Sequence, residues 1–302
     1  MNPSLASTSP AVGRRKLVSR LVGIALAASL AAQILVLGFY ARDQRYLAQL
    51  MDAIASPSLP PSEQALRVSA FLRDKPSDTN DSYFLLPLFR LLRATPRQAA
   101  EQGGDCADRS RLLVELLALR GIHASKWALY APDLLPKHAV AEVQAETGKM
   151  VVDPLFGLTF PRPGGGYYGI EDLRRDPTIL RQRVLQLRAQ HARPDAEKLE
   201  RYPLDQYVYD HARTINWEKS TVLRVAYPVL HALMGDRVDR LTRPEWAEQP
   251  ALMVVLYLVG LEGGLLVLWG LAIRRKGRKK PSAVGLAQMR LARTPESSQP
   301  EA

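Results

Sequence analysis

Cys106 is the only cysteine in the chain, and it stands in the sequence GGDCADRSRLL, where a helix is expected to begin. A thiol attacks an acyl carbon as its thiolate. A helix N-terminus together with an imidazolium partner lowers a thiol pKa from about 8.5 to roughly 3.5–7.5. The first N–H groups of such a helix can also stabilise an oxyanion. The position therefore indicates nucleophilic chemistry, whereas a lone cysteine without partners is more often a small buried residue.

His138 and Asp153 are the residues that could serve this thiol. His138 opens one expected strand (138–145), and Asp153 lies near the end of the next (149–156). With the turn centred on Thr147, the position facing His138 lies two or three residues beyond Asp153. That offset allows a diagonal cross-strand contact, which a bulge could shorten. An acid in this place would hold the tautomer and the orientation of the imidazole.

The elements that must position these residues are expected to form an α+β fold. The helix that carries Cys106 starts after the N-cap Asp105 and ends at Gly121. A strand over 123–131 and the hairpin that contains His138 and Asp153 follow it. Elsewhere, apolar spacing predicts helices over 42–55, 62–73, 83–93, 95–102, 170–191 and 204–241.

Two long apolar stretches flank this domain. Leu21–Ala41 has no charged residue in 21 positions, and Ala251–Ile273 has only Glu262 in 23. At 1.5 Å per residue, each is long enough to cross a hydrocarbon core of about 30 Å. The first run continues ten residues beyond a possible cleavage site at Ala31, which favours an uncleaved anchor. We therefore expect two transmembrane helices.

The charge distribution sets the expected orientation. Residues 1–20 carry a net charge of +4 and residues 274–302 a net charge of +6, out of +11 for the chain. Basic flanks of membrane helices stay in the cytoplasm, so both termini are expected there. Residues 42–249 then lie across the membrane, which in a bacterium means a periplasmic domain anchored in the inner membrane. The cytoplasmic preference of basic flanks also explains the net positive charge of the chain. Nucleic acid is therefore excluded as a partner.

The order of these motifs resembles the transglutaminase-like superfamily. The first matching stretch is GGDCADRSRLLVELLALRGIHASKWALY, in which Gly-x-Cys opens a leucine-rich helix that ends in Gly-Ile. The second is KHAVAEVQAETGKMVVDP, in which His-Ala starts a strand and Asp-Pro follows a glycine-containing turn. The cysteine precedes the histidine by 32 residues, and the histidine precedes the aspartate by 15. The resemblance covers residues 103–160, about a fifth of the chain, and Val140 stands where the family often has an aromatic residue.

The resemblance implies a papain-related α+β core, in which the helix carrying the cysteine packs on an antiparallel sheet. It implies that Cys106, His138 and Asp153 form a catalytic triad. Members of the superfamily include transglutaminases that cross-link proteins, cysteine proteases, peptide amidases and catalytically inactive relatives. No cofactor is implied, the sequence has no acidic calcium loop, and its histidines lack metal-ligand spacing.

Three further residues are candidates for contacts with the oxyanion or the substrate. Gln102 precedes the cysteine, as does the glutamine that donates to the oxyanion in papain-like enzymes; the alternative is a solvated loop residue. Gly104, together with Gly103, would let a substrate backbone come close. Trp127 is expected in the core, with a role in shaping an acyl pocket as the alternative.

Glu262 lies inside the second apolar stretch, where a charged carboxylate costs several kcal/mol. Gly260 and Gly264 flank it in a Gly-x-x-x-Gly motif that is typical of close helix packing. We therefore expect this region to pack against the first membrane helix or against another subunit.

Two functions from different classes follow. The first is a membrane-anchored thiol enzyme, a cysteine protease, amidase or transglutaminase-type acyltransferase, that acts on peptide or protein amide bonds through a thioester. The second is an inactive module that binds partner membrane proteins, or further copies of itself, in an envelope or export complex. The expected division of the chain is a cytoplasmic tail (1–20), a membrane helix (21–41), a helical segment (42–100), the core (101–169), a helical juxtamembrane segment (170–249), a second membrane helix (250–273) and a basic tail (274–302).

Overall fold

The computed structural model describes residues 10–76, 94–133, 135–190, 199–217, 221–243 and 248–277. The helix expected over 83–93, and most of the basic residues of the C-terminal tail, lie outside the described residues. The chain divides into two compact units. One consists of residues 1–34 and 255–302, and the other consists of residues 35–254.

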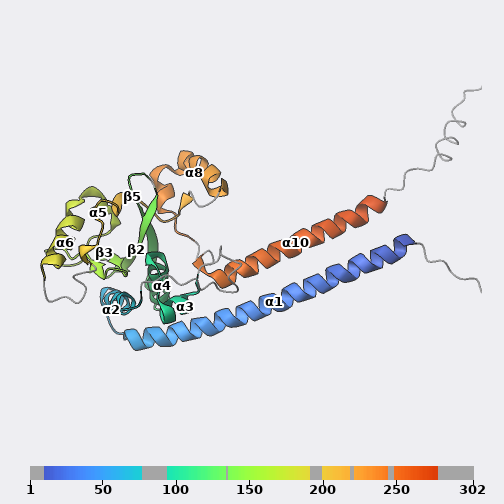
Figure 1. Cartoon of the computed structure of the whole chain (residues 1–302), viewed down its shortest axis with the longest axis horizontal. Coiled ribbons are helices and arrows are strands. Elements are labelled where there is room, and N and C mark those ends of the chain that lie inside the picture. The colour runs from blue at the N-terminus through green and yellow to red at the C-terminus, as the bar shows by residue number, and fades with distance from the viewer. Residues whose placement is uncertain are drawn as a thin grey trace, which may run out of the picture. The chain divides into compact units, whose positions relative to one another are not determined.

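Helices α1 (Pro10–Ile54) and α10 (Pro250–Gly277) supply the described part of the first unit (Figure 1). Each contains a segment that is long and apolar enough to cross a membrane, Leu17–Ile54 and Pro250–Leu271. Large apolar side chains along both are exposed, for example Ile24 at 66% and Leu268 at 65%. Exposed apolar surface on this scale is typical of contact with lipid or with a partner protein.

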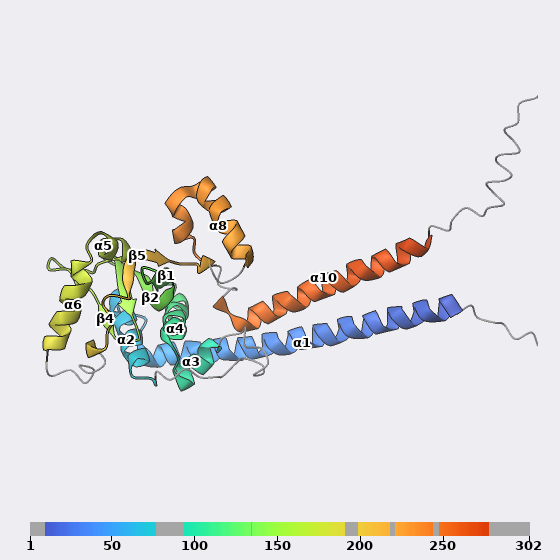
Figure 2. The ribbon, with the colours of Figure 1, turned by 45° about the horizontal axis from the view of Figure 1, so that its top comes forward.

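An antiparallel sheet of five strands is the centre of the second unit, which confirms the α+β class (Figure 2). Its strands follow the order β4-β3-β2-β1-β5. A tight turn at Glu146 and Thr147 joins β2 to β3 and pairs Ala145 with Gly148. The strands are β1 (Ala124–Tyr130), β2 (Pro136–Ala145), β3 (Gly148–Asp153), β4 (Leu158–Thr159) and β5 (Val208–Arg213).

Helix α4 (Cys106–Ala118) lies on one face of this sheet, together with α2 (Pro61–Arg73) and α3 (Pro96–Gln102). Its leucines at 112, 113, 116 and 117 are fully buried and share a core with Ala141 and Val143 of β2. The C-terminal part of α1 contributes Leu47 and Met51 to the same core. Gly121 ends α4 with a φ of +69°, as its sequence predicted.

The other face of the sheet is covered by α5 (Ile170–Arg175) and α6 (Thr178–Ala189). The sequence predicted one helix over 170–191, and this prediction is wrong because two short helices form instead. Pro177 lies between them, and proline cannot donate the backbone hydrogen bond that a continuous helix needs.

The prediction of an entirely helical segment over 204–241 is also wrong. Among the described residues of this range, the helices are α8 (Thr221–Met234) and the 3₁₀-helix η2 (Gly235–Arg240), and most of the residues before them are not helical. Residues 208–213 form β5, which pairs with β1 at the edge of the sheet. Within β5, Tyr209 and Ala212 are buried against the α5–α6 side. Residues 208–213 therefore form a strand and not a helix, because pairing with the open edge of β1 outweighs their local helical preference.

Candidate functional site

Cys106 is the first residue of α4 and is partly exposed. Asp105 caps the helix, and its side chain accepts a hydrogen bond of 2.9 Å from the backbone N–H of Asp108. The thiol therefore lies at the positive end of a helix of 13 residues.

The two glycines before Asp105 both come close to other parts of the chain. Gly103 has a φ of +86°, and a Cβ on it would clash with the carbonyl oxygen of Pro76. A Cβ on Gly104 would lie 2.8 Å from the Cβ of Asp108. The packing of the chain therefore requires glycine at both positions.

His138 and Asp153 are brought together by the register of β2 and β3. Ala141 lies opposite Val152, so the position facing His138 falls two residues beyond Asp153. Across this diagonal, Nε2 of His138 lies 2.6 Å from Oδ2 of Asp153, and both side chains have no exposed surface. The other oxygen, Oδ1, accepts hydrogen bonds from the backbone N–H groups of Leu155 and Phe156, at 3.1 and 3.2 Å. The carboxylate is thereby fixed from both sides.

The electrostatics of this pair favour a protonated imidazole. Burial lowers the pKa of His138, but the charge of Asp153 and its hydrogen bond outweigh burial and raise that pKa above its ordinary value of 6.5. Cys106 also raises the pKa of His138.

Nδ1 of His138 is the ring nitrogen left for the thiol, because Nε2 contacts Asp153. Within the described part of the chain, Nδ1 is buried and makes no hydrogen bond of standard length and angle. The sulfur of Cys106 therefore makes no hydrogen bond to Nδ1 in this structure. Hydrogen bonds between catalytic groups are often loose without substrate and tighten when substrate binds.

Aromatic rings enclose the imidazole. Tyr207 stacks on His138 with ring centroids 4.1 Å apart and an interplanar angle of 6°. Phe156 and Tyr202 meet the imidazole edge-on at 5.6 and 6.4 Å. Burial, followed by the charges of Cys106 and Asp153, raises the pKa of Tyr207 to about 12, so its phenol stays neutral. Tyr207 immediately precedes β5, in the segment expected to be helical, and the tyrosine-rich sequence around it was the signal that could have identified it.

Arg109 is a second residue that the sequence analysis missed. It lies three residues after Cys106 and is only 1% exposed. Burial lowers the pKa of Arg109, and the nearby charges of Asp153, Cys106 and Asp105 oppose this effect. Its guanidinium donates to the backbone carbonyls of Gly104 (2.9 Å), Leu72 (2.5 Å), Arg73 (3.3 Å), Lys75 (2.7 Å) and Pro76 (2.7 Å). Arg109 thus joins the segment after α2 to the loop that leads into the thiol.

The remaining candidates near the thiol have different surroundings. Gln102 is exposed at the end of α3. Trp127 is 4% exposed, faces Val140 across the β1–β2 pair, and donates its indole N–H to Ser125 at 3.0 Å. These contacts place Trp127 in the core.

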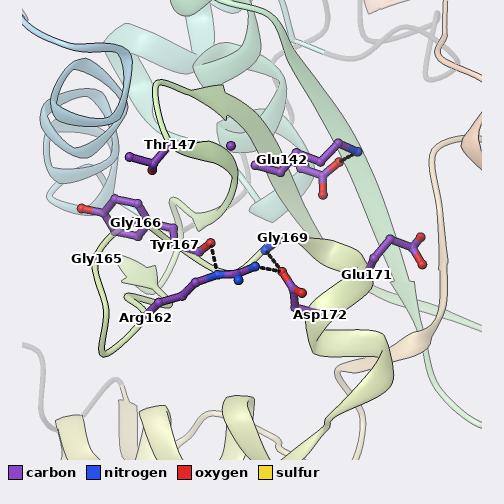
Figure 3. A pocket seen from close by; sticks show the side chains of 11 residues that line it. Glu142, Thr147, Arg162, Gly165, Gly166, Tyr167, Gly169, Glu171 and Asp172 are labelled. Atoms are coloured by element: carbon purple, nitrogen blue, oxygen red, sulfur yellow. Dashed lines mark hydrogen bonds and ion pairs between the residues drawn. The ribbon is translucent and has the colours of Figure 1, made fainter.

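A polar pocket of about 340 Å³ lies away from these residues, between the β2–β3 hairpin, the loop before α5 and α5 itself (Figure 3). Its charged groups satisfy one another. Arg162 contacts Asp172 at 2.6 Å, and Glu142 binds both Lys149 and the backbone N–H of Ile170, at 2.9 Å each. Glu142 is four residues along β2 from the histidine, which corresponds to about 13 Å. We assign this pocket a structural role in holding the start of α5.

Glu262 has a partner within the first unit. The side-chain amide of Gln33 in α1 donates a hydrogen bond of 2.7 Å to its carboxyl group. Gly260 and Gly264 have a different environment, because a Cβ on either would meet nothing within 4 Å. The contact with the first helix therefore runs through the polar pair and not through the glycines. Gln33 carries the one side-chain amide in the first apolar stretch. This polar residue in an apolar segment was the sequence signal that could have identified the pair.

The Gln33→Leu variant is expected to weaken the association of α1 and α10 by about 1 kcal/mol, because it leaves the Glu262 carboxyl without its donor in apolar surroundings. The double variant Gln33→Leu, Glu262→Leu is expected to recover most of this loss, since no polar group is then left unpaired. Thermal unfolding of the full chain in lipid nanodiscs measures both effects. Independent, additive losses would show that the two side chains are not coupled.

Comparisons of the chain with protein-family models, with curated proteins and with solved structures found no match.

Proposed function

We propose that this chain is a membrane-anchored thiol enzyme of the transglutaminase-like kind, acting on amide bonds of peptides or proteins. The observation that carries the proposal is the buried hydrogen bond between His138 and Asp153, beside a partly exposed thiol at the N-terminus of α4. The three side chains are spread over 48 positions of the chain, and the start of one helix and one hairpin carry them. That combination is what acyl transfer through a thiolate requires.

In the proposed reaction, His138 takes the proton of the Cys106 thiol and is held as an imidazolium by Asp153. The sulfur attacks the amide carbonyl carbon, and the first N–H groups of α4 face the oxygen on which negative charge develops. The C–N bond then breaks, and His138 gives its proton to the leaving amine. Water or a second amine resolves the thioester, which yields hydrolysis or transamidation respectively.

The burial pattern restricts the substrate. His138 and Asp153 have no exposed side-chain surface, so a substrate approaches from the side of the sulfur, and the imidazole exchanges protons with it there. Aromatic rings lie against the imidazole on several sides. We propose peptide or protein amides of the bacterial envelope as the source of the acyl group. In this proposal α1 and α10 cross the inner membrane, and the intervening domain is periplasmic.

Alkylation of the thiol tests this proposal in a clean system, because the chain has one cysteine. At pH 7, iodoacetamide is expected to modify Cys106 at least about tenfold faster in the folded full chain than in His138→Ala, since the imidazole keeps the sulfur as thiolate. The variant His123→Ala, which changes an exposed histidine at the other end of α4, is expected to behave as wild type. Equal rates in wild type and His138→Ala would reject the enzyme and favour an inactive binding module.

A further inference from the structure

The largest cavity among those described in the second unit has a volume of about 670 Å³ and lies at the end of α4 opposite Cys106. Volumes of this size are typical of sites for small organic ligands. Its walls come from the outer part of α1, the second half of α4, the start of β1 and the residues around the start of α10. No step of the proposed thiol reaction uses this cavity.

One wall of the cavity is positively charged. Lys126 and Arg243 both contact the carboxylate of Glu248, at 2.6 and 2.8 Å, and Arg111 donates to the backbone carbonyl of Glu248 at 3.3 Å. One carboxylate therefore faces two cationic side chains directly, with a third beside it. Burial, together with repulsion from Arg243 and Arg111, lowers the pKa of Lys126 to about 8 despite the attraction of Glu248. The cavity is lined by three cations, Arg111, Lys126 and Arg243, against two carboxylates, Glu115 and Glu248, so one additional anion beside Lys126 and Arg243 would balance the lining charge.

Other lining residues are apolar and include the ends of the membrane-length helices, with the polar pair of Gln44 and Glu115, 3.3 Å apart, among them. Tyr40 is the penultimate residue of the first apolar stretch, and Leu252 is the second residue of the other. Val114 and Leu119 of α4 also belong to this apolar lining. The cavity thus combines cationic side chains with the ends of the two segments that are expected to enter the bilayer.

We propose that this cavity binds an anionic phospholipid, with its phosphate beside Lys126 and Arg243 and the start of its acyl chains along Tyr40, Val114 and Leu252. The lipid would come from the leaflet on the side of the domain. The inference requires α1 and α10 to cross the membrane, and it does not depend on the thiol chemistry. Cations supply the specificity for an anionic headgroup, and the apolar lining distinguishes a lipid from a free phosphate.

Native mass spectrometry of the detergent-purified full chain tests the proposal. Phosphatidylglycerol is expected to be retained about tenfold more strongly than phosphatidylcholine of the same chain length, a ratio that corresponds to one well-placed charge interaction. Millimolar inorganic phosphate is expected not to displace it. Arg243→Gln is expected to remove the preference for phosphatidylglycerol, whereas Arg240→Gln, which alters a cation that pairs with Glu171 outside this cavity, is expected to retain it.

A second variant keeps the test decisive if Arg243→Gln fails to fold. Val114→Phe fills the apolar side without changing charge, and it is expected to reduce retention of both lipids. Equal retention of the two lipids by wild type, or full retention of phosphatidylglycerol by folded Arg243→Gln and Val114→Phe, would overturn the assignment. Displacement by inorganic phosphate would overturn the lipid as the ligand in favour of a free anion.

Discussion

Asp153→Ala is expected to lower the rate at which Cys106 is acylated by about 10³–10⁴-fold, the scale seen when the acid of a catalytic triad is disabled. Without the carboxylate, burial is the dominant influence on His138 and lowers the pKa of its imidazole. The ring then no longer carries the thiol proton as a stable imidazolium. Release of p-nitrophenolate from p-nitrophenyl acetate by the full chain reports this rate without knowledge of the natural substrate.

Asp153→Asn is the matched control for this prediction. Its amide oxygen can still accept a hydrogen bond, and a Cys-His-Asn arrangement supports catalysis in papain-like enzymes. The loss is therefore expected to be smaller than in Asp153→Ala. A circular-dichroism melt of each variant separates loss of the fold from loss of the proton relay. Equal rates for wild type and folded Asp153→Ala would contradict the role given to the carboxylate.

Arg109→Leu is expected to reduce the free energy of unfolding by about 3–5 kcal/mol, the cost of removing a buried charged partner. The side chain donates to five carbonyls on two segments, and leucine supplies no donor to any of them. Thermal unfolding of the full chain in detergent measures the loss. The same variant is expected to slow acylation, because the carbonyl of Gly104 loses the contact that holds the loop before Cys106.

Arg67→Leu provides the comparison. Arg67 lies on α2 with its side chain 49% exposed and pairs with Glu63 at 3.1 Å. An exposed pair of this kind contributes at most about 1 kcal/mol. If Arg109→Leu destabilised the chain no more than Arg67→Leu does, the buried guanidinium would not be the tie between the two segments.

The contact between His138 and Asp153 could be predicted because it depends on local rules. A short turn fixes the register of a hairpin, and the register fixes which residues approach across it. The start of α4 was predictable for the same reason, since its cap and its first turn are encoded within a few neighbouring residues. The sequence pattern was therefore sufficient to predict elements whose geometry depends on neighbouring residues alone.

The residues around the imidazole could not be found in this way. Tyr207 reaches His138 because β5 pairs with the open edge of β1, and that pairing joins segments about 80 residues apart in the chain. Arg109 looks like a surface residue in sequence, and only the carbonyls of another segment make its burial tolerable. Gln33 and Glu262 are similar, because the partner of each polar side chain lies 229 positions away.

Acetylation of the sulfur itself tests the nucleophilic role of Cys106 most directly. When p-nitrophenyl acetate reacts, a bond forms between the sulfur and the acetyl carbon, the ester C–O bond breaks, and p-nitrophenolate leaves. Mass spectrometry of the briefly treated full chain, followed by peptide mapping, is predicted to show one acetyl group, located on Cys106 and absent in His138→Ala. Acetyl groups on lysines alone, or equal acetylation of Cys106 with and without the imidazole, would contradict a thiol activated by this histidine.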